Sequence, residues 1–175
     1  GLYGLAREHF RLAINSDERH AQAWQAWGVF ESRHGHSDTA RAIFLKGLKL
    51  CPTHPTLWQA AATFEKEQSN IRRARSIYKA GITHCADLPK NAALSAAADA
   101  ERAHSNVSYL LLVLWGAKFE MHQKRLPQAQ ELLSLAHAID SSSGEVYYLQ
   151  AMLLKFQGQL LDARRAVEEG LRLAP

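Results

Sequence analysis

The stretch from Trp24 to Leu48, WQAWGVFESRHGHSDTARAIFLKGL, contains two apolar periodic segments separated by a polar turn. It recurs further along the chain, from Trp58 to Ile82, as WQAAATFEKEQSNIRRARSIYKAGI. The matching positions are Trp24 and Trp58, Phe30-Glu31 and Phe64-Glu65, Ala40-Arg41 and Ala74-Arg75, Phe44 and Tyr78, and Gly47 and Gly81. A fixed period of about 34 residues indicates stacked two-helix repeats. Such a stack offers an extended surface, so we expect binding rather than catalysis.

Each repeat is predicted to contain a front helix followed by an antiparallel back helix. The first front helix is predicted over His20–Arg33, and its back helix ends near Leu50, before a proline. Pro55 opens the second front helix, and Ile71–Thr83 forms its back helix. The predicted fold class is therefore all-α, a right-handed superhelix (solenoid) of antiparallel helix pairs.

The N-terminal segment, Leu2 to Ile14, matches a back helix without its front helix, and the chain begins with Gly1. We therefore expect a fragment or processed form of a longer protein. Polar residues before the next two helices are predicted to be N-caps, Ser16 or Asp17 for the first and Ser37 or Asp38 for the second.

The period slips after the second repeat. The position one period after Ala74 is Ser108, which does not match, and the next match is Ala129. Two helices, 91–104 and 107–124, are predicted in between, with Asp99 or Glu101 as a counterpart of the front-helix acid. Either the repeat here is degenerate and lacks a back helix, or residues are absent near Ser105.

The period resumes with helices predicted over 127–139, 147–157 and 161–173, which makes about ten helices in all. We describe residues 1–175 as a single helical-repeat array. Clear repeats cover 1–86, an irregular junction covers 87–108, and further repeats cover 109–175.

Composition fits a protein with a substantial core, since 47% of the 175 residues are hydrophobic and 22% are charged. No apolar run reaches the roughly 20 residues of a membrane span. The formal net charge of +4 is compatible with nucleic-acid binding and equally with ordinary solvated helix surfaces.

The two cysteines, Cys51 and Cys85, also lie one period apart. Equivalent residues of stacked helices are roughly 10 Å apart, which exceeds the reach of a disulfide. We therefore predict free thiols and an intracellular, reducing compartment.

The front helices with Trp24, Trp27 and Phe30-Glu31, and the back helices with Ala40-Arg41, resemble the HAT (half-a-TPR) repeat. The final repeat, in which Leu154 replaces the acid, looks more like an ordinary tetratricopeptide repeat. The phrase AWQAWGVFE, residues 23–31, resembles the HAT proteins of organellar RNA stability. The resemblance implies a scaffold in RNA processing, with no cofactor and no reaction.

Several residues of the repeat are interpreted as structural. Glu31 and Arg41 lie ten residues apart, as do Glu65 and Arg75, so each pair is expected to meet across the two helices of one repeat. Trp24, Trp27 and Trp58 lie on the apolar stripe, which favours core packing over base stacking.

Two surfaces are candidates for binding. The concave face, lined by front helices, would present polar side chains that could read bases or grip a peptide backbone. These are Gln22, Gln25, Arg33, Gln59, Thr63, Lys66, Lys118, His122, Tyr148, Lys155 and Phe156. The back helices carry the candidate contacts to RNA phosphates, Lys46, Lys49, Arg72, Arg73 and Lys79. Ordinary solvation explains either set as well.

Catalysis and metal binding have no supporting motif. His34 and His36 flank a turn glycine without a third ligand nearby. No nucleophile with a base, glycine-rich phosphate loop or pair of placed carboxylates is present. We therefore expect no enzyme activity, cofactor, metal or small-molecule substrate.

The sequence favours a scaffold in RNA processing or RNA stabilisation that binds single-stranded RNA, other RNA-processing proteins, or both. The alternative is a protein–protein interaction module that holds a peptide or helix in the concave groove without touching RNA. The chloroplast stroma is the expected location, with the nucleus as the alternative, and no membrane association is expected.

Overall fold

The computed structural model describes residues 1–86 and 96–173, without the side chains of 96–105. These residues form nine α-helices and no strand, which confirms the all-α class. No helix in this part of the chain is both long and apolar enough to cross a bilayer. The helices are α1 (Leu2–Ser16), α2 (Ala21–Arg33), α3 (Ser37–Leu50), α4 (Pro55–Glu67), α5 (Ile71–Cys85), α6 (Ala96–His122), α7 (Leu126–Ile139), α8 (Gly144–Phe156) and α9 (Leu160–Leu173).

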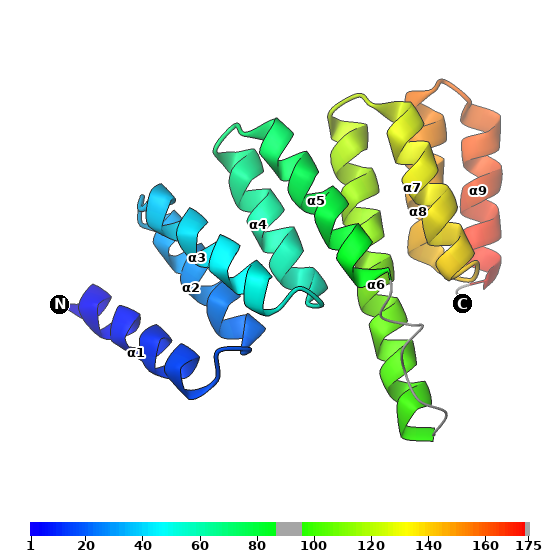
Figure 1. Cartoon of the computed structure of the whole chain (residues 1–175). Helices are drawn as coiled ribbons and strands as arrows, with labels where there is room; N and C mark the ends of the chain where they lie inside the picture. Colours follow the sequence, from blue (N-terminus) through cyan, green and yellow to red (C-terminus); the bar gives the residue numbers. More distant parts are fainter. Residues whose placement is uncertain (87–95, 174–175) are drawn as a thin grey trace. The chain divides into compact units, whose positions relative to one another are not determined.

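The contacts divide the chain into two compact units, residues 1–92 and 93–175. In the first unit α2 pairs with α3 and α4 with α5, while α1 packs on α2, and α4 packs on both α2 and α3 (Figure 1). In the second unit α6 pairs with α7 and α8 with α9, and α7 packs on α8. The front helices are thus α2, α4, α6 and α8. A single continuous array stays a prediction.

The junction differs from the prediction, because one helix of 27 residues, α6, replaces the two predicted helices. It passes through Ser105 without a break, since no Gly or Pro occurs between Ala96 and Trp115 to interrupt its hydrogen bonds. α6 is the front helix that pairs with α7. Residues 91–95 and the side chains of Asp99 and Glu101 lie outside the description.

A close contact between a back-helix glycine and a front-helix aromatic side chain holds three of the four helix pairs together, α2–α3, α4–α5 and α8–α9. A methyl group on Gly47 would lie 2.8 Å from Cβ of Trp24, and one on Gly81 would lie 2.7 Å from Cγ of Trp58. Gly170 has the same relation to Tyr147, at 2.8 Å from its Cβ. These distances are shorter than van der Waals contact, so only glycine permits this approach of the two helices.

In all four helix pairs, the turn from front to back helix contains a residue with left-handed backbone conformation at the same repeat position. The backbone φ angles are +79° at Gly35, +62° at Ser69, +58° at Lys124 and +79° at Gly158. The next backbone N–H then bonds back to the helix, as from Asn70 to the Glu65 carbonyl at 2.8 Å. This is the usual C-terminal cap of a helix, which favours glycine.

The opposite turn, from back to front helix, is held by the tryptophan indoles. Nε1 of Trp24 donates to the carbonyl of Glu18, and Nε1 of Trp58 donates to the carbonyl of Pro52, both at 2.8 Å. The N-cap predictions were wrong for both helices. Ser37 and Asp38 lie in the first turn of α3, whose N-cap is His36, and neither Ser16 nor Asp17 is the N-cap of α2. His20 takes this position because its Nδ1 accepts the N–H of Ala23 at 3.1 Å.

We expect Ser69→Gly and Lys124→Gly each to stabilise the protein by about 1 kcal/mol, because a residue with a Cβ is strained at positive φ. Gly35→Ser is the reverse control and should destabilise by a similar amount. Urea denaturation followed by circular dichroism measures both effects, and an unchanged or lower midpoint for both glycine variants would contradict this account.

Candidate functional site

A groove of about 230 Å³ lies between the front helices α2 and α4. It is lined by Gln25, Val29, Ser32 and Arg33 of α2, by Phe44 of α3, and by Gln59, Ala60, Thr63, Phe64 and Glu67 of α4. Four of the predicted concave-face residues, Gln25, Arg33, Gln59 and Thr63, therefore converge on one site.

The two walls of the groove present the same repeat positions, one period apart. Gln25 faces the groove from α2, and Gln59 is its counterpart on α4. Arg33 and Glu67 are likewise counterparts, so the groove carries one positive and one negative charge at the same end. The sequence prediction missed Glu67, which the period could have identified from Arg33.

The floor of the groove is aromatic. The rings of Phe44 and Phe64 lie 5.4 Å apart, and the guanidinium carbon of Arg41 lies 5.5 Å from the Phe64 ring centroid. On the wall, Nε2 of Gln59 donates to Oγ1 of Thr63 at 3.3 Å. A glutamine side chain offers both a donor and an acceptor. The groove can therefore bind polar backbone groups along its walls and an apolar side chain on its floor.

Ion pairs between successive repeats fix the front helices that form these walls. Arg7 of α1 binds the buried carboxylate of Glu31 on α2 with two hydrogen bonds of 2.7 Å. Arg41 of α3 binds Glu65 of α4 in the same way, at 2.7 and 3.4 Å. Each arginine thus holds the glutamate of the front helix that follows it in the chain.

This arrangement corrects the predicted pairing of Glu31 with Arg41 and of Glu65 with Arg75 inside one repeat. Arg41 projects toward the next front helix rather than toward its own, so it reaches Glu65. A neighbouring residue completes each site, with Trp27 Nε1 at 2.9 Å from Glu31 Oε1 and Asn70 Nδ2 at 2.8 Å from Glu65 Oε2.

The hydrogen bonds keep both glutamates ionised despite their burial. Those from Arg7, assisted by Trp27, hold the pKa of Glu31 below its ordinary value. Burial alone would raise the pKa of Glu65, but the hydrogen bonds from Arg41 and Asn70 and the nearby positive charges lower it overall.

The other concave-face candidates lie elsewhere. Gln22 and Lys66 are exposed and do not line the groove. Lys118 and His122 are exposed on α6. Tyr148, Lys155 and Phe156 line a separate pocket between α8 and α9 in the second unit.

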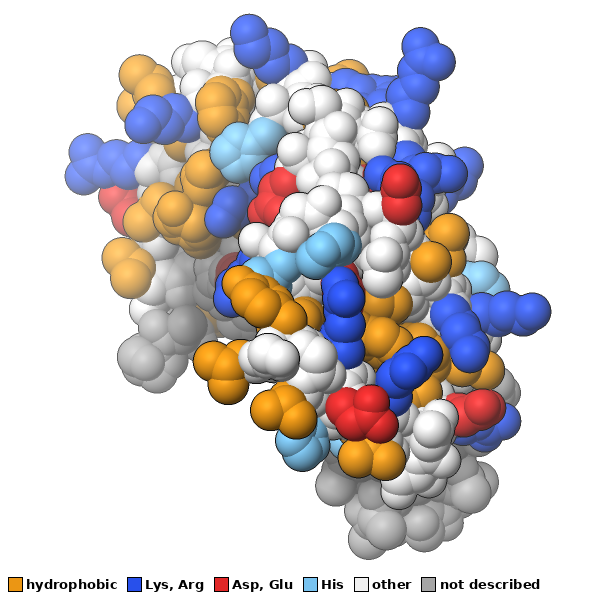
Figure 2. All heavy atoms as spheres, turned by 90° about the vertical axis from the view of Figure 1, so that its left-hand side faces the viewer, with side chains coloured by type: hydrophobic (Ala, Val, Ile, Leu, Met, Phe, Trp, Pro, Cys, Tyr) orange, Lys and Arg blue, Asp and Glu red, His pale blue; other side chains and the backbone are white. Residues whose placement is uncertain are grey.

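The back-helix cations do not form one basic surface. Lys46, Lys49, Arg72, Arg73 and Lys79 are all exposed. The two arginines lie in the first turn of α5, whereas Lys46 and Lys49 match positions about 10–17 Å further along that helix. Arg73 lies 3.8 Å from Glu65, and Lys46 lies 5.4 Å from the Trp24 ring. On the face shown in Figure 2, Lys and Arg side chains are scattered among apolar and neutral ones.

The tryptophans belong to the core, as predicted. Trp24 and Trp58 are buried, and Trp27 is half-buried between the rings of Phe10 and Trp24. Cys51 and Cys85 are free and buried, which confirms the predicted thiols. Burial raises the pKa of Cys85 to about 11, so this thiol is unreactive.

The histidines of the turn also have structural contacts. The ring of His34 packs on Phe30, with centroids 4.3 Å apart, and Nδ1 of His36 lies 3.1 Å from Oε2 of Glu31. In the described part of the chain, no three metal-ligating side chains gather in a group that could hold an ion.

Comparison with known proteins places this fold. Residues 21–64 match the family model described as tetratricopeptide repeat. A search of curated protein sequences gave no match. This stretch is therefore similar to a tetratricopeptide repeat, and the described helix pairs share the all-α repeat fold, while the organellar HAT subtype stays a prediction.

Solved structures share the fold at low sequence identity. A crystal structure of MamA aligns with a TM-score of 0.61 and 11% identity over 94% of this chain and 84% of that one. The assembly chaperone of RpL4 aligns with a TM-score of 0.62 and 16% identity over 98% of this chain and 68% of that one. The Cut9–Hcn1 hetero-tetramer of the APC/C aligns with a TM-score of 0.61 and 15% identity, but this chain spans only 28% of the matched chain. These likenesses establish the fold alone.

A double-mutant cycle tests the pairing between repeats. We expect Arg41→Met and Glu65→Gln to be coupled by about 1–3 kcal/mol, because the two side chains share hydrogen bonds. Arg41→Met and Glu31→Gln should be additive within about 0.5 kcal/mol. Unfolding free energies from urea titration give both values, and the opposite pattern would restore the pairing inside one repeat.

Proposed function

We propose that this protein is an interaction module whose α2–α4 groove binds an extended peptide segment of a partner protein. The observation that carries the proposal is the pair of glutamine amides, Gln25 and Gln59, on opposite walls above an aromatic floor. Amides and an apolar floor match the two parts of a peptide, its backbone and its side chains.

The spacing of the two amides suits an extended peptide. Equivalent positions on packed helices lie about 10 Å apart. An extended chain rises about 3.3 Å per residue, so three peptide residues span the distance between the walls. One amide can then bond the backbone at the first of these residues and the other at the last, with a central side chain against Val29 and the small exposed edges of Phe44 and Phe64.

Charge contributes less than these contacts to the choice of ligand. Arg33 and Glu67 carry opposite charges, and neither forms a salt bridge within the described part of the chain. Their net effect on a ligand is small, so the backbone and the apolar side chain decide affinity. The groove holds no nucleophile hydrogen-bonded to a base among its described residues, which supports binding rather than catalysis.

Single-stranded RNA is the second candidate ligand, in the role of an RNA-processing scaffold in the chloroplast stroma or the nucleus. It is supported by the net charge of +4 and by the exposed cations of the back helices. It has the weaker support, because phosphate binding requires several cations along one path and these lie in two groups.

The peptide proposal is tested by selecting binders from a displayed library of random short peptides and measuring their affinity by fluorescence anisotropy. We expect Gln25→Ala with Gln59→Ala to weaken the selected peptides about tenfold or more, since two backbone bonding sites are lost. Gln22→Ala, an exposed glutamine outside the groove, is the control and should change nothing. Selected peptides that bind the Gln25→Ala, Gln59→Ala double variant as tightly as the Gln22→Ala control would refute binding in the α2–α4 groove.

RNA binding is tested with a labelled single strand of about 15–20 nucleotides at about 50 mM and 200 mM salt. We expect affinity no tighter than about 1 µM, the range of non-specific binding. A tighter complex that is lost in Lys46→Glu with Lys49→Glu, and that the Gln25 and Gln59 changes leave intact, would instead establish RNA as the ligand.

A further inference from the structure

Two opposite charges lie at one end of the α2–α4 groove without a partner of their own. Arg33, at the end of α2, and Glu67, at the end of α4, are both exposed and both line the groove. Neither forms a salt bridge in the described part of the chain. Both charges can therefore interact with a ligand.

The other charges near the floor of the groove are already paired. Arg41, whose guanidinium carbon lies 5.5 Å from the Phe64 ring centroid, bonds Glu65 at 2.7 Å and Asp38 at 3.1 Å. Glu65 is buried and also accepts a hydrogen bond from Asn70. Among the described residues that line it, the groove thus offers a ligand one cation and one anion, on opposite walls.

Opposite charges on the two walls select a ligand by the arrangement of its own charges. A ligand with the same charge throughout is attracted by one wall and repelled by the other, so the two effects cancel. A ligand with an acidic group toward α2 and a basic group toward α4 is attracted by both walls. Charges at the rim of a site contribute to specificity more than to affinity. This is compatible with an affinity that depends on the peptide backbone and the apolar side chain.

The positions of the two charges relative to the amides define the side chains that can reach them. Arg33 follows Gln25 by eight residues, and Glu67 follows Gln59 by eight, which is about 12 Å along each helix. Helix side chains tilt toward the N-terminus, so Arg33 and Glu67 extend back toward the amides. A peptide residue held by its backbone at an amide still needs a long side chain to meet them. Glutamate suits the Arg33 side, and lysine or arginine suits the Glu67 side.

We propose that the α2–α4 groove selects peptides in which a glutamate and a lysine or arginine flank one apolar residue. The glutamate binds Arg33, and the basic residue binds Glu67. This inference rests on the proposed peptide binding in the groove and specifies its ligand. A glutamine amide offers both a donor and an acceptor, so Gln25 and Gln59 can bond a strand of either direction. The charge pair then sets the direction in which a given peptide crosses the groove.

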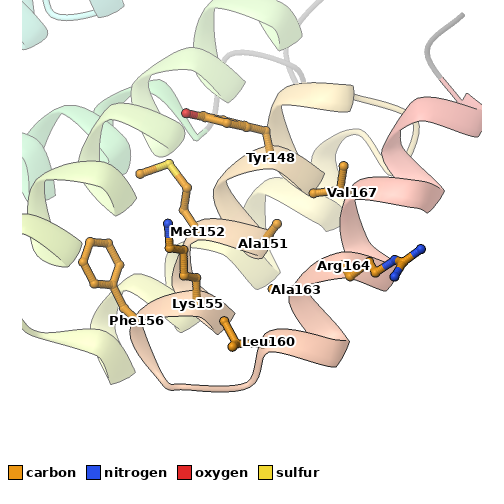
Figure 3. A pocket seen from close by; sticks show the side chains of 9 residues that line it. All are labelled: Tyr148, Ala151, Met152, Lys155, Phe156, Leu160, Ala163, Arg164 and Val167. Atoms are coloured by element: carbon orange, nitrogen blue, oxygen red, sulfur yellow. The ribbon is translucent and has the colours of Figure 1, made fainter.

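The pocket between α8 and α9 shows that this charge pair is not a general feature of the repeat. Tyr148 and Phe156 line that pocket at the repeat positions of Gln25 and Arg33 (Figure 3). Both charged residues that line it, one from each helix, are basic. The selection for mixed charge is therefore expected of the α2–α4 groove and not of the α8–α9 pocket.

The test starts from a peptide selected on the protein whose binding depends on Gln25 and Gln59. Alanine scanning locates its apolar residue, and the residues on either side are replaced in four combinations: Glu and Lys, Lys and Glu, two Glu, and two Lys. We expect both mixed versions to bind about threefold or more tighter than either uniform version, because each exposed charge pair contributes up to about 1 kcal/mol. Fluorescence anisotropy measures the four affinities.

Reversing one charge of the protein should change the preferred peptide. Arg33→Glu makes both walls acidic, so the version with two lysines should bind tightest. Glu67→Arg makes both walls basic, so the version with two glutamates should bind tightest. The two changes together should restore the preference for the mixed versions. The control exchanges two opposite exposed charges outside the groove, Glu18→Arg with Arg19→Glu, and should leave the order of affinities unchanged.

The results separate this inference from the proposal on which it rests. If no selected peptide depends on Gln25 and Gln59, peptide binding in the groove is wrong, and the charge selection is wrong with it. If such a peptide exists but its four versions bind within about twofold of one another, binding in the groove stands and the charge selection is refuted. An order of affinities that Arg33→Glu and Glu67→Arg leave unchanged refutes the charge selection as well.

Discussion

The fold depends on how closely a back helix approaches its front helix. Gly47 lies against Trp24, and Gly81 against Trp58, at distances that leave no room for a methyl group. This contact turns the tryptophan face of α2 and of α4 toward the back helix of the same pair. The next residue, Gln25 or Gln59, is rotated by about 100° and therefore lies on the groove side. The packing of one face thus determines which side chains the other face offers to a ligand.

The ion pairs act in the other direction, from one repeat to the next. Glu31 and Glu65 are buried, and a buried carboxylate is stable only when charged partners surround it. Arg7 and Arg41 supply that charge from the preceding back helix. Removing an arginine would leave the buried carboxylate of its glutamate without a charged partner. Each ion pair therefore constrains the position of a front helix. The groove walls are held in register by these contacts as well as by apolar packing.

Much of the fold could be predicted from the repeat period, including the helix boundaries of the first unit and the core role of Trp24 and Trp58. The partner of each glutamate could not. Arg41 lies between Glu31 and Glu65 in the chain, and both separations recur with the period, so only the direction of its side chain selects one. The sequence assigned the groove residues to the concave face of the front helices. That four of them line one groove could not be predicted, because it depends on how α2 packs on α4. The prediction of two helices at the junction was wrong for a different reason. Polar residues alone do not end a helix in a stretch that lacks Gly and Pro.

At the contact between α7 and α8, both members of the arginine–glutamate pair are replaced by uncharged residues. Gln130 takes the position of Arg41, and Leu154 takes that of Glu65. Both charges are therefore absent from this contact, and no buried charge is left without a partner. On α9 the arginine is present again as Arg164, together with apolar residues at the positions that α4 covers on α3. An exposed arginine alone has no structural meaning, because solvent satisfies it. An arginine accompanied by that complete apolar pattern repeats the α3 surface on which α4 packs, and Gln130 shows that this arginine is not an obligatory feature of the back helix.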